Sequence, residues 1–243
     1  MTLLALLLAL SPAAATPAPA AEESVWVATL IQAAPGRLLE LIDLEKGFRA
    51  AAAERGDETP WLMRHSQGDK WDLLRLQPVK SLREYFAEER VARRDRWRKK
   101  AAAELARARD AIAWQEDVVV RGPSASEARE RLSGAGFFHI EMFVALPGRQ
   151  ADLIHQREME NAYSKALSRP TNLIFTRDSG AAWDLFTVGA YRDLKHYAES
   201  ADIAESAQET AAKGAGFEGV KAIGPYLRTL IREHHDTLAT AVP

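Results

Sequence analysis

A histidine and a glutamate two residues apart are the clearest candidates for chemistry in this sequence. His139 and Glu141 lie in the segment 137–146, whose β-branched and aromatic residues predict a strand. Residues i and i+2 of a strand point to one face, about 7 Å apart at a rise of ~3.3 Å per residue. That spacing allows a water-bridged pair, with His139 as catalytic base and Glu141 as its orienting partner. The alternative is a satisfied polar pair, completed by Arg177 or Arg228.

Two tryptophans occupy equivalent places in a repeated pattern. Trp71-Asp72-Leu73 recurs as Trp183-Asp184-Leu185, and Pro35-Gly36-Arg37 recurs at the same offset as Pro147-Gly148-Arg149. The constant offset predicts a tandem repeat of one unit of roughly 110 residues. The tryptophans could stack an aromatic ligand or fill the centre of the fold. The repeated aspartates are expected to accept hydrogen bonds from backbone amides.

Each unit is predicted to follow the order β-α-β-β-α-β. The breaks fall at Pro-Gly and Gly-Asp turns, and the helices show apolar residues at helical spacing. The expected strands are 25–33, 61–65, 71–76, 114–120, 137–146, 173–177, 183–188 and 226–233. The expected domain organisation is a signal peptide over 1–20, a first repeat over 21–121, a linker over 122–136, a second repeat over 137–235 and a tail over 236–243.

A strand ending in Pro-Gly, a helix, a hairpin with an aromatic second strand and a Leu-x-x-Tyr helix together resemble the dimeric α/β-barrel superfamily. The NIPSNAP-like branch is the most similar, and the resemblance covers residues 24–235. It implies an α+β fold in which two tandem ferredoxin-like (βαββαβ) units form an intramolecular dimeric α/β barrel. The superfamily includes cofactor-independent monooxygenases, haem-degrading oxygenases and small isomerases or decarboxylases that work inside the barrel.

Strand alternation predicts which side chains face the barrel interior. We assign the uniformly apolar row of Ile140, Met142 and Val144 to the helix side. The opposite row, His139, Glu141 and Phe143, would then point into the barrel. The same reasoning turns inward the hairpin residues Trp71, Leu73, Arg75, Trp183, Leu185 and Thr187.

The inward row predicts a binding protein for a small apolar or aromatic ligand held between the two sheets. The expected ligand-binding residues are Trp71, Trp183, Phe143, Arg177 and Arg228. The first alternative is an oxygenase- or isomerase-type enzyme, cofactor-independent or haem-linked, that uses His139 and Glu141 in the lumen. No cofactor is predicted, although a haem version would need an axial histidine facing an open slot.

A second alternative is a structural protein that acts through the basic run 90–100 (RVARRDRWRKK). Acidic residues precede this run at helical spacing, so a solvated helix face is the simpler interpretation. The formal charge of −2 is spread over both halves, which excludes the basic excess of a nucleic-acid-binding protein.

No metal site is predicted. The sequence has no cysteine, and the adjacent His234 and His235 would point to opposite faces of a strand. Neither a P-loop nor a dinucleotide-binding glycine motif occurs in the sequence.

The first twenty residues resemble a secretory signal. Leu3 to Leu10 form an apolar run, and Ala18-Pro19-Ala20 fits a small-x-small cleavage site. We therefore expect a periplasmic or secreted protein without an integral membrane segment after cleavage. The fused units predict a monomeric pseudo-dimer or a homodimer.

Overall fold

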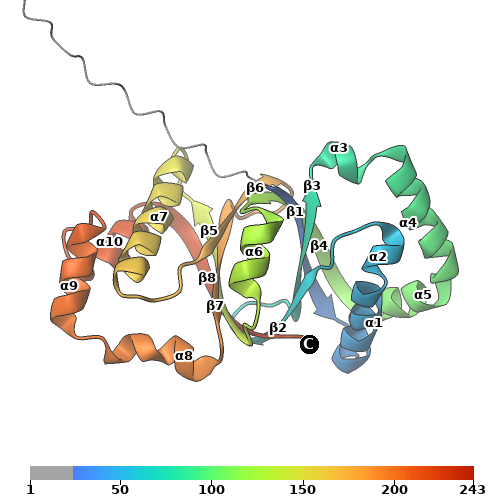
Figure 1. Cartoon of the computed structure of the whole chain (residues 1–243), viewed down its shortest axis with the longest axis horizontal. Coiled ribbons are helices and arrows are strands. Elements are labelled where there is room, and N and C mark those ends of the chain that lie inside the picture. Colours follow the sequence, from blue (N-terminus) through green and yellow to red (C-terminus); the bar gives the residue numbers. More distant parts are fainter. Residues whose placement is uncertain (1–23) are drawn as a thin grey trace, which may run out of the picture.

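A computed structural model describes residues 24–243, and its eight strands form one antiparallel sheet (Figure 1). The strands are β1 (Ser24–Ala33), β2 (Trp61–Gln67), β3 (Leu73–Lys80), β4 (Ile112–Gly122), β5 (Phe137–Ala145), β6 (Leu173–Ser179), β7 (Leu185–Tyr191) and β8 (Ile231–Ala241). Every strand pairs with two neighbours, and the order β1-β3-β2-β8-β5-β7-β6-β4 closes into a barrel. The predicted α+β class, with eight strands, is confirmed.

The N-terminal and C-terminal halves contribute four strands each, in the same order. The first half supplies β4-β1-β3-β2 and the second β8-β5-β7-β6, and the halves join where β2 pairs with β8 and β4 with β6. The helices lie outside the barrel, with α1–α5 on one side and α7–α10 on the other (Figure 1).

The helical elements are α1 (Leu38–Ala50), α2 (Ala52–Arg55), α3 (Leu82–Tyr85), α4 (Glu88–Lys100), α5 (Ala102–Ala111), α6 (Ala125–Leu132), α7 (Gln150–Ala166), α8 (Leu194–Ala198), η1 (Glu199–Asp202), α9 (Glu205–Gly214), η2 (Val220–Ala222) and α10 (Ile223–Arg228). None of the helices within residues 24–243 combines the length and hydrophobicity that a membrane span requires.

The barrel interior is filled by apolar side chains from both halves. Phe175 and Phe186 stack with ring centroids 4.7 Å apart, and Trp26 meets Phe175 edge-on at 5.5 Å. Trp71 and Trp183 belong to the same cluster. The linker helix α6 lies across the barrel between the two helix groups (Figure 1) and adds its apolar side chains to the cluster.

The prediction of which side chains face the barrel interior was wrong for β5. Ile140 and Met142 face the barrel interior, whereas Phe143 packs with Leu153 and Leu185 against the helices of the second half. His139 and Glu141, in the same row as Phe143, therefore face the helices rather than the lumen. The physical reason is that a closed interior excludes water, so it takes the most uniformly apolar row. The helix side reaches solvent at its edges and tolerates charge.

The hairpin residues predicted to face inward do not all lie on the same side of the sheet. Trp71 and Trp183 precede their strands, so the alternation within β3 and β7 does not extend back to them. They point inward as predicted, but Leu73 and Leu185 pack under the helices.

The last strand begins and ends later than predicted. Residues 226–233 were expected to form it, but α10 occupies 223–228, and β8 runs from Ile231 to Ala241. The predicted tail, 236–243, is therefore mostly strand, paired with both β2 and β5. Its inward positions, Thr237 and Ala239, are small, so they give only a weak apolar pattern, yet both are buried. The predicted signal peptide lies outside the described residues.

The repeated aspartates fasten the hairpins to the first strand of each half. Oδ2 of Asp72 accepts a hydrogen bond from the amide of Ala33, and Oδ2 of Asp184 accepts one from Ala145, each at 2.8 Å. This is the backbone role that the sequence predicts, and it is the same in both halves. A further bond joins Arg177 to Oδ1 of Asp184 at 2.8 Å.

Replacing Asp72 with alanine should lower the free energy of unfolding by about 1–3 kcal/mol, because a half-buried amide loses its acceptor. Urea denaturation with an unchanged m-value is the measurement. Asp95→Ala is the control, since Asp95 meets Arg98 in an exposed pair. Equal stability of the two variants would contradict the fastening role.

Candidate functional site

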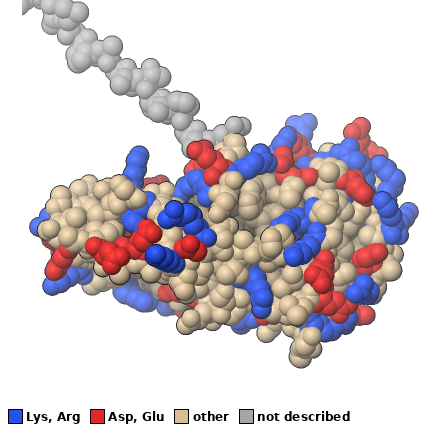
Figure 2. Space-filling view, turned by 60° about the horizontal axis from the view of Figure 1, so that its bottom comes forward, with Lys and Arg blue, Asp and Glu red and all other residues tan. Residues whose placement is uncertain are grey.

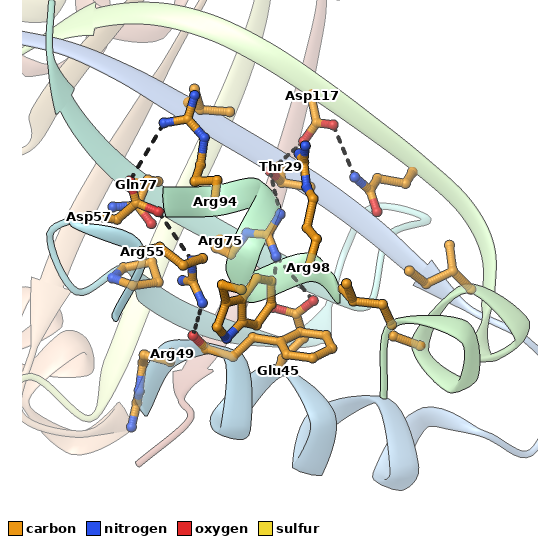
Figure 3. A pocket seen from close by; sticks show the side chains of 18 of the residues that line it. Thr29, Glu45, Arg49, Arg55, Asp57, Arg75, Gln77, Arg94, Arg98 and Asp117 are labelled. Atoms are coloured by element: carbon orange, nitrogen blue, oxygen red, sulfur yellow. Dashed lines mark hydrogen bonds and ion pairs between the residues drawn. The ribbon is translucent and has the colours of Figure 1, made fainter. Parts of the chain in front are cut away.

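A cavity of about 750 Å³ lies between the sheet and the helices of the N-terminal half (Figure 3). Strands β1, β3 and β4 form its floor, and residues of α1, α4 and α5 and of the chain before β2 form its walls. This volume suits a small organic ligand. Its aromatic lining residues are Phe48, Tyr85, Phe86, Trp97 and Trp114.

Asp57 gathers three arginines at one edge of this cavity. Arg55 Nε lies 3.1 Å from its carboxylate, and Arg90 Nη2 lies 2.9 Å from it. Arg94 Nη1 lies 4.0 Å from Oδ1 of the same group. One carboxylate among three guanidinium groups leaves a local excess of positive charge.

Arg94 is the most enclosed of these arginines, with only 8% of its surface exposed. Its Nη2 donates to the carbonyl of Tyr85 at 2.7 Å, and its guanidinium lies 4.1 Å from the centroid of the Tyr85 ring. Its Nη1 is buried and has no hydrogen-bond partner among the described residues. A buried donor without an acceptor is unfavourable, so Nη1 is available to an acceptor in the cavity.

The floor of the cavity carries a chain of polar contacts (Figure 3). Arg75 Nη1 lies 2.9 Å from Oε2 of the buried Glu45, and its Nη2 donates to Oγ1 of Thr29 at 3.3 Å. The Thr29 hydroxyl donates to Oδ1 of Asp117 at 2.6 Å. Across the whole lining, six arginines face three carboxylates, an excess of three positive charges.

The rim of the cavity is apolar. Leu82 begins α3 and Phe86 follows its end, and they are 38% and 65% exposed although both line the cavity. Large apolar side chains exposed beside a hollow are typical of a surface that meets a ligand.

The basic run 90–100 is only partly the solvated face that the sequence predicts. Arg94 is buried, and Arg90 reaches inward to Asp57. Trp97, on the same helix, packs under the guanidinium of Arg55 at 4.5 Å. Helix α4 is therefore a wall of the cavity. Elsewhere, basic and acidic side chains are interspersed over the visible surface (Figure 2).

The corresponding space in the C-terminal half is filled by a buried ion pair. Arg157 of α7, whose side chain is 1% exposed, lies 3.3 Å from Oε2 of Glu141. Thr187 donates to the same oxygen at 3.1 Å, and Glu160 holds the other side of the guanidinium. Burial favours the protonated form of the Glu141 carboxyl group. The hydrogen bond from His234 and the positive charge of Arg157 outweigh this effect, so the pKa of Glu141 lies below its ordinary value.

Two histidines and Asp236 complete this cluster. Nε2 of His139 lies 3.1 Å from Oδ1 of Asp236, and Nε2 of His234 lies 3.3 Å from the same atom. Burial opposes the charge on His139, yet the Asp236 hydrogen bond and nearby Glu141 raise its pKa. Hydrogen bonds to Asp236 and Glu141 raise the pKa of His234 to about 9, and the two histidines lower the pKa of Asp236.

The structure places the predicted site residues in separate regions of the fold. His139, Glu141 and Phe143 come together in the C-terminal cluster, where Phe143 stacks on His234 at 5.0 Å. Trp71 and Trp183 lie in the barrel core. The remaining two are elsewhere, with Arg177 on Asp184 and Arg228 at the end of α10. No shared ligand site unites these seven residues.

The residues of the N-terminal cavity were not predicted. Its lining includes six arginines, of which Arg94 and Arg98 belong to the run that the sequence predicts to be a solvated helix face. The arginines come together with Asp57 and Glu45 only in the folded chain. The repeat contains one signal that could have shown that the two clefts differ. Thr29 and Glu141 stand at equivalent positions, as do Glu45 and Arg157, so the two halves differ in charge at the same place.

Haem does not fit the residues of the N-terminal cavity. No histidine is among its described lining residues, so the nitrogen donor of a histidine-ligated haem is missing there. In the C-terminal half, both Nε2 atoms of the cluster already face carboxylates. We therefore derive no haem chemistry for either cleft.

Replacing Arg157 with methionine should lower the free energy of unfolding by about 3–5 kcal/mol, because the buried Glu141 would lose the guanidinium charge that it shares with Glu160. Arg107→Met is the control and should cost at most about 1 kcal/mol, since Arg107 meets Glu40 in an exposed pair. Denaturant unfolding measures both variants. A loss below about 1 kcal/mol for Arg157→Met would contradict the buried pair.

The sequence matches no known protein-family profile and no curated protein. Solved structures do share its fold. An anthrone oxidase-like protein is 12% identical with a TM-score of 0.55, over 91% of this chain and 92% of its own. A monooxygenase-like protein from Lactobacillus acidophilus NCFM is 7% identical with a TM-score of 0.51, over 90% and 94% of the two chains.

A haem-binding protein from Thermus thermophilus is 14% identical with a TM-score of 0.43, over 90% of this chain and 91% of its own. The fold assignment rests on the first two structures, whose identity to this chain is too low to transfer an activity. The eight-stranded sheet, its flanking helices and these neighbours together assign the chain to the dimeric α/β-barrel fold.

Proposed function

We propose that this protein binds a small anionic molecule with an apolar or aromatic body in the cavity of its N-terminal half. The observation that carries the proposal is the buried Nη1 of Arg94, which has no hydrogen-bond partner among the described residues, inside a lining with three more arginines than carboxylates. A guanidinium group offers paired donors that match a carboxylate or phosphate. The aromatic walls would hold the body of the ligand.

The proposed ligand keeps the apolar or aromatic body that the sequence predicts, but it carries an anionic group and binds in a different place. The lumen between the sheets is occupied by the core cluster, and the cleft between sheet and helices is hollow. An enzyme that uses His139 as a base in the lumen receives no support, because His139 lies outside the barrel. Docking of a partner on the basic helix is also disfavoured, since Arg90 and Arg94 are already held by Asp57 and Tyr85.

The ligand-binding test uses 2-naphthoate and its neutral analogue 2-naphthamide, compared by isothermal titration calorimetry. We expect the carboxylate to bind at least tenfold more tightly, since a hydrogen bond to a charged group contributes about 1.5–3 kcal/mol. Arg94→Gln should remove that preference. Arg107→Gln, on the exposed surface outside the cavity lining, should leave it unchanged.

A second variant separates cavity binding from effects on folding. Ala113 is exposed and lines the cavity, so Ala113→Trp should block the space without disturbing the core. Binding of 2-naphthoate should then be lost while the thermal unfolding midpoint is retained. Equal affinity for the carboxylate and the amide, or full binding by Ala113→Trp, would refute the proposed site.

We also propose that the chain is a fusion of two ferredoxin-like units, related to the NIPSNAP-like branch, that closes its barrel within one molecule. The supporting observations are the constant sequence offset and the repeated strand order. In this arrangement none of the described strands has an edge left to pair with a second subunit. Light scattering after size-exclusion chromatography should give the mass of a monomer, and a dimer that survives dilution would contradict this expectation.

A further inference from the structure

The cluster in the C-terminal half has a donor set that the buried ion pair alone does not explain. Four side chains of metal-ligating type converge from two adjacent strands, His139 and Glu141 from β5 and His234 and Asp236 from β8. One ligand atom each of His139, Glu141 and Asp236 lies within 4.8 Å of the other two. Two imidazoles with two carboxylates is a donor set that suits zinc and neighbouring divalent transition metals.

Three of the distances between the ligand atoms match the edges of a metal polyhedron. The Nε2–Oδ1 distances from His139 and His234 to Asp236 are 3.1 and 3.3 Å, and Nε2 of His234 lies 3.4 Å from Oε1 of Glu141. Tetrahedral ligands at about 2.0–2.1 Å from zinc are ~3.3–3.4 Å from one another. An ion bound by His139, Glu141 and Asp236 would need only small movements of these side chains. His234, which lies near Glu141 and Asp236, would have to move toward the ion to complete the set.

Supporting contacts fix the orientation of the buried members. Thr187 donates to Oε2 of Glu141, and Arg157 lies on the side of Glu141 away from the strand pair, neutralised in turn by Glu160. The His234 ring stacks on Phe143 with an interplanar angle of 19°. Such outer contacts hold ligands in place and contribute to metal affinity.

The cluster is open to solvent on one side. The side chain of Asp236 is 53% exposed, whereas those of His139, Glu141 and His234 are 18%, 11% and 12% exposed. An ion could enter past Asp236, and water could reach a remaining coordination position.

The N-terminal half lacks this donor set at the equivalent positions. The repeat offset aligns Val27 with His139 and Thr29 with Glu141. Strand pairing aligns Gln115 with His234 and Asp117 with Asp236, because Gln115 pairs with Ile31 as His234 pairs with Phe143. Three of the four ligands are therefore absent there, so the cluster is not a requirement of the fold.

We infer that His139, Glu141, His234 and Asp236 form a binding site for one divalent transition-metal ion of the zinc type. This site is separate from the proposed ligand cavity and does not depend on it. Carboxylates paired with protonated histidines, without a metal, are the competing outcome.

The test uses the full chain without an affinity tag, treated with a chelator and then titrated with Zn²⁺ in a calorimeter. Native mass spectrometry should show one zinc ion per chain, and the thermal unfolding midpoint should rise with added zinc. Co²⁺ serves as an optical probe, because nitrogen and oxygen ligands in a tetrahedral site give visible absorption bands.

Matched histidine variants assign the binding to this cluster. His234→Asn should weaken zinc affinity by at least about tenfold, whereas His235→Asn, on the opposite face of the same strand, should not change it. Should His234→Asn fail to fold, Asp236→Asn gives the same information, since the side chain of Asp236 is half exposed and lies outside the apolar core. Absence of a zinc adduct in the wild type, or equal loss in His235→Asn, would overturn the inference.

Discussion

The exclusion of water from the barrel is the constraint on which the rest of the structure depends. Eight strands close around a packed core of Trp26, Phe175, Phe186 and their neighbours. Because a charged side chain is costly in that space, each strand sends its charged row outward, under the helices. Polar chemistry is therefore confined to the two clefts between sheet and helices, one in each half.

The two clefts differ in the charge of the side chain that the helix directs toward the sheet. In the first half, Glu45 on the helix meets Arg75 on the sheet, and α4 and α5 stand away from the floor and leave a cavity. In the second half, the equivalent helix position is Arg157, which reaches down to Glu141 and fills the space. The exchange of a carboxylate and a guanidinium between the halves accompanies a cationic pocket in one cleft and a buried ion pair beside a polar cluster in the other.

The fold could be predicted from the sequence because it depends on local signals, namely turns, alternation and the 112-residue repeat. Alternation divides a strand into two rows but does not say which row faces inward, and this placed His139 on the wrong side. His234 was set aside because its neighbour His235 faces the other side of the strand, and Asp236 was missed because small residues such as Ala239 hide the second half of β8. The cavity was missed because contacts such as Arg90 with Asp57 join residues far apart in the chain.

A crystal structure with bound 6-bromo-2-naphthoate tests the central claim most directly, because the anomalous signal of bromine locates the ligand independently of the side chains. The account predicts a bromine peak between β4 and α4, with the carboxylate against Arg94. A peak inside the barrel, beside Trp71 and Trp183, would show that the lumen is the binding site and would contradict the account.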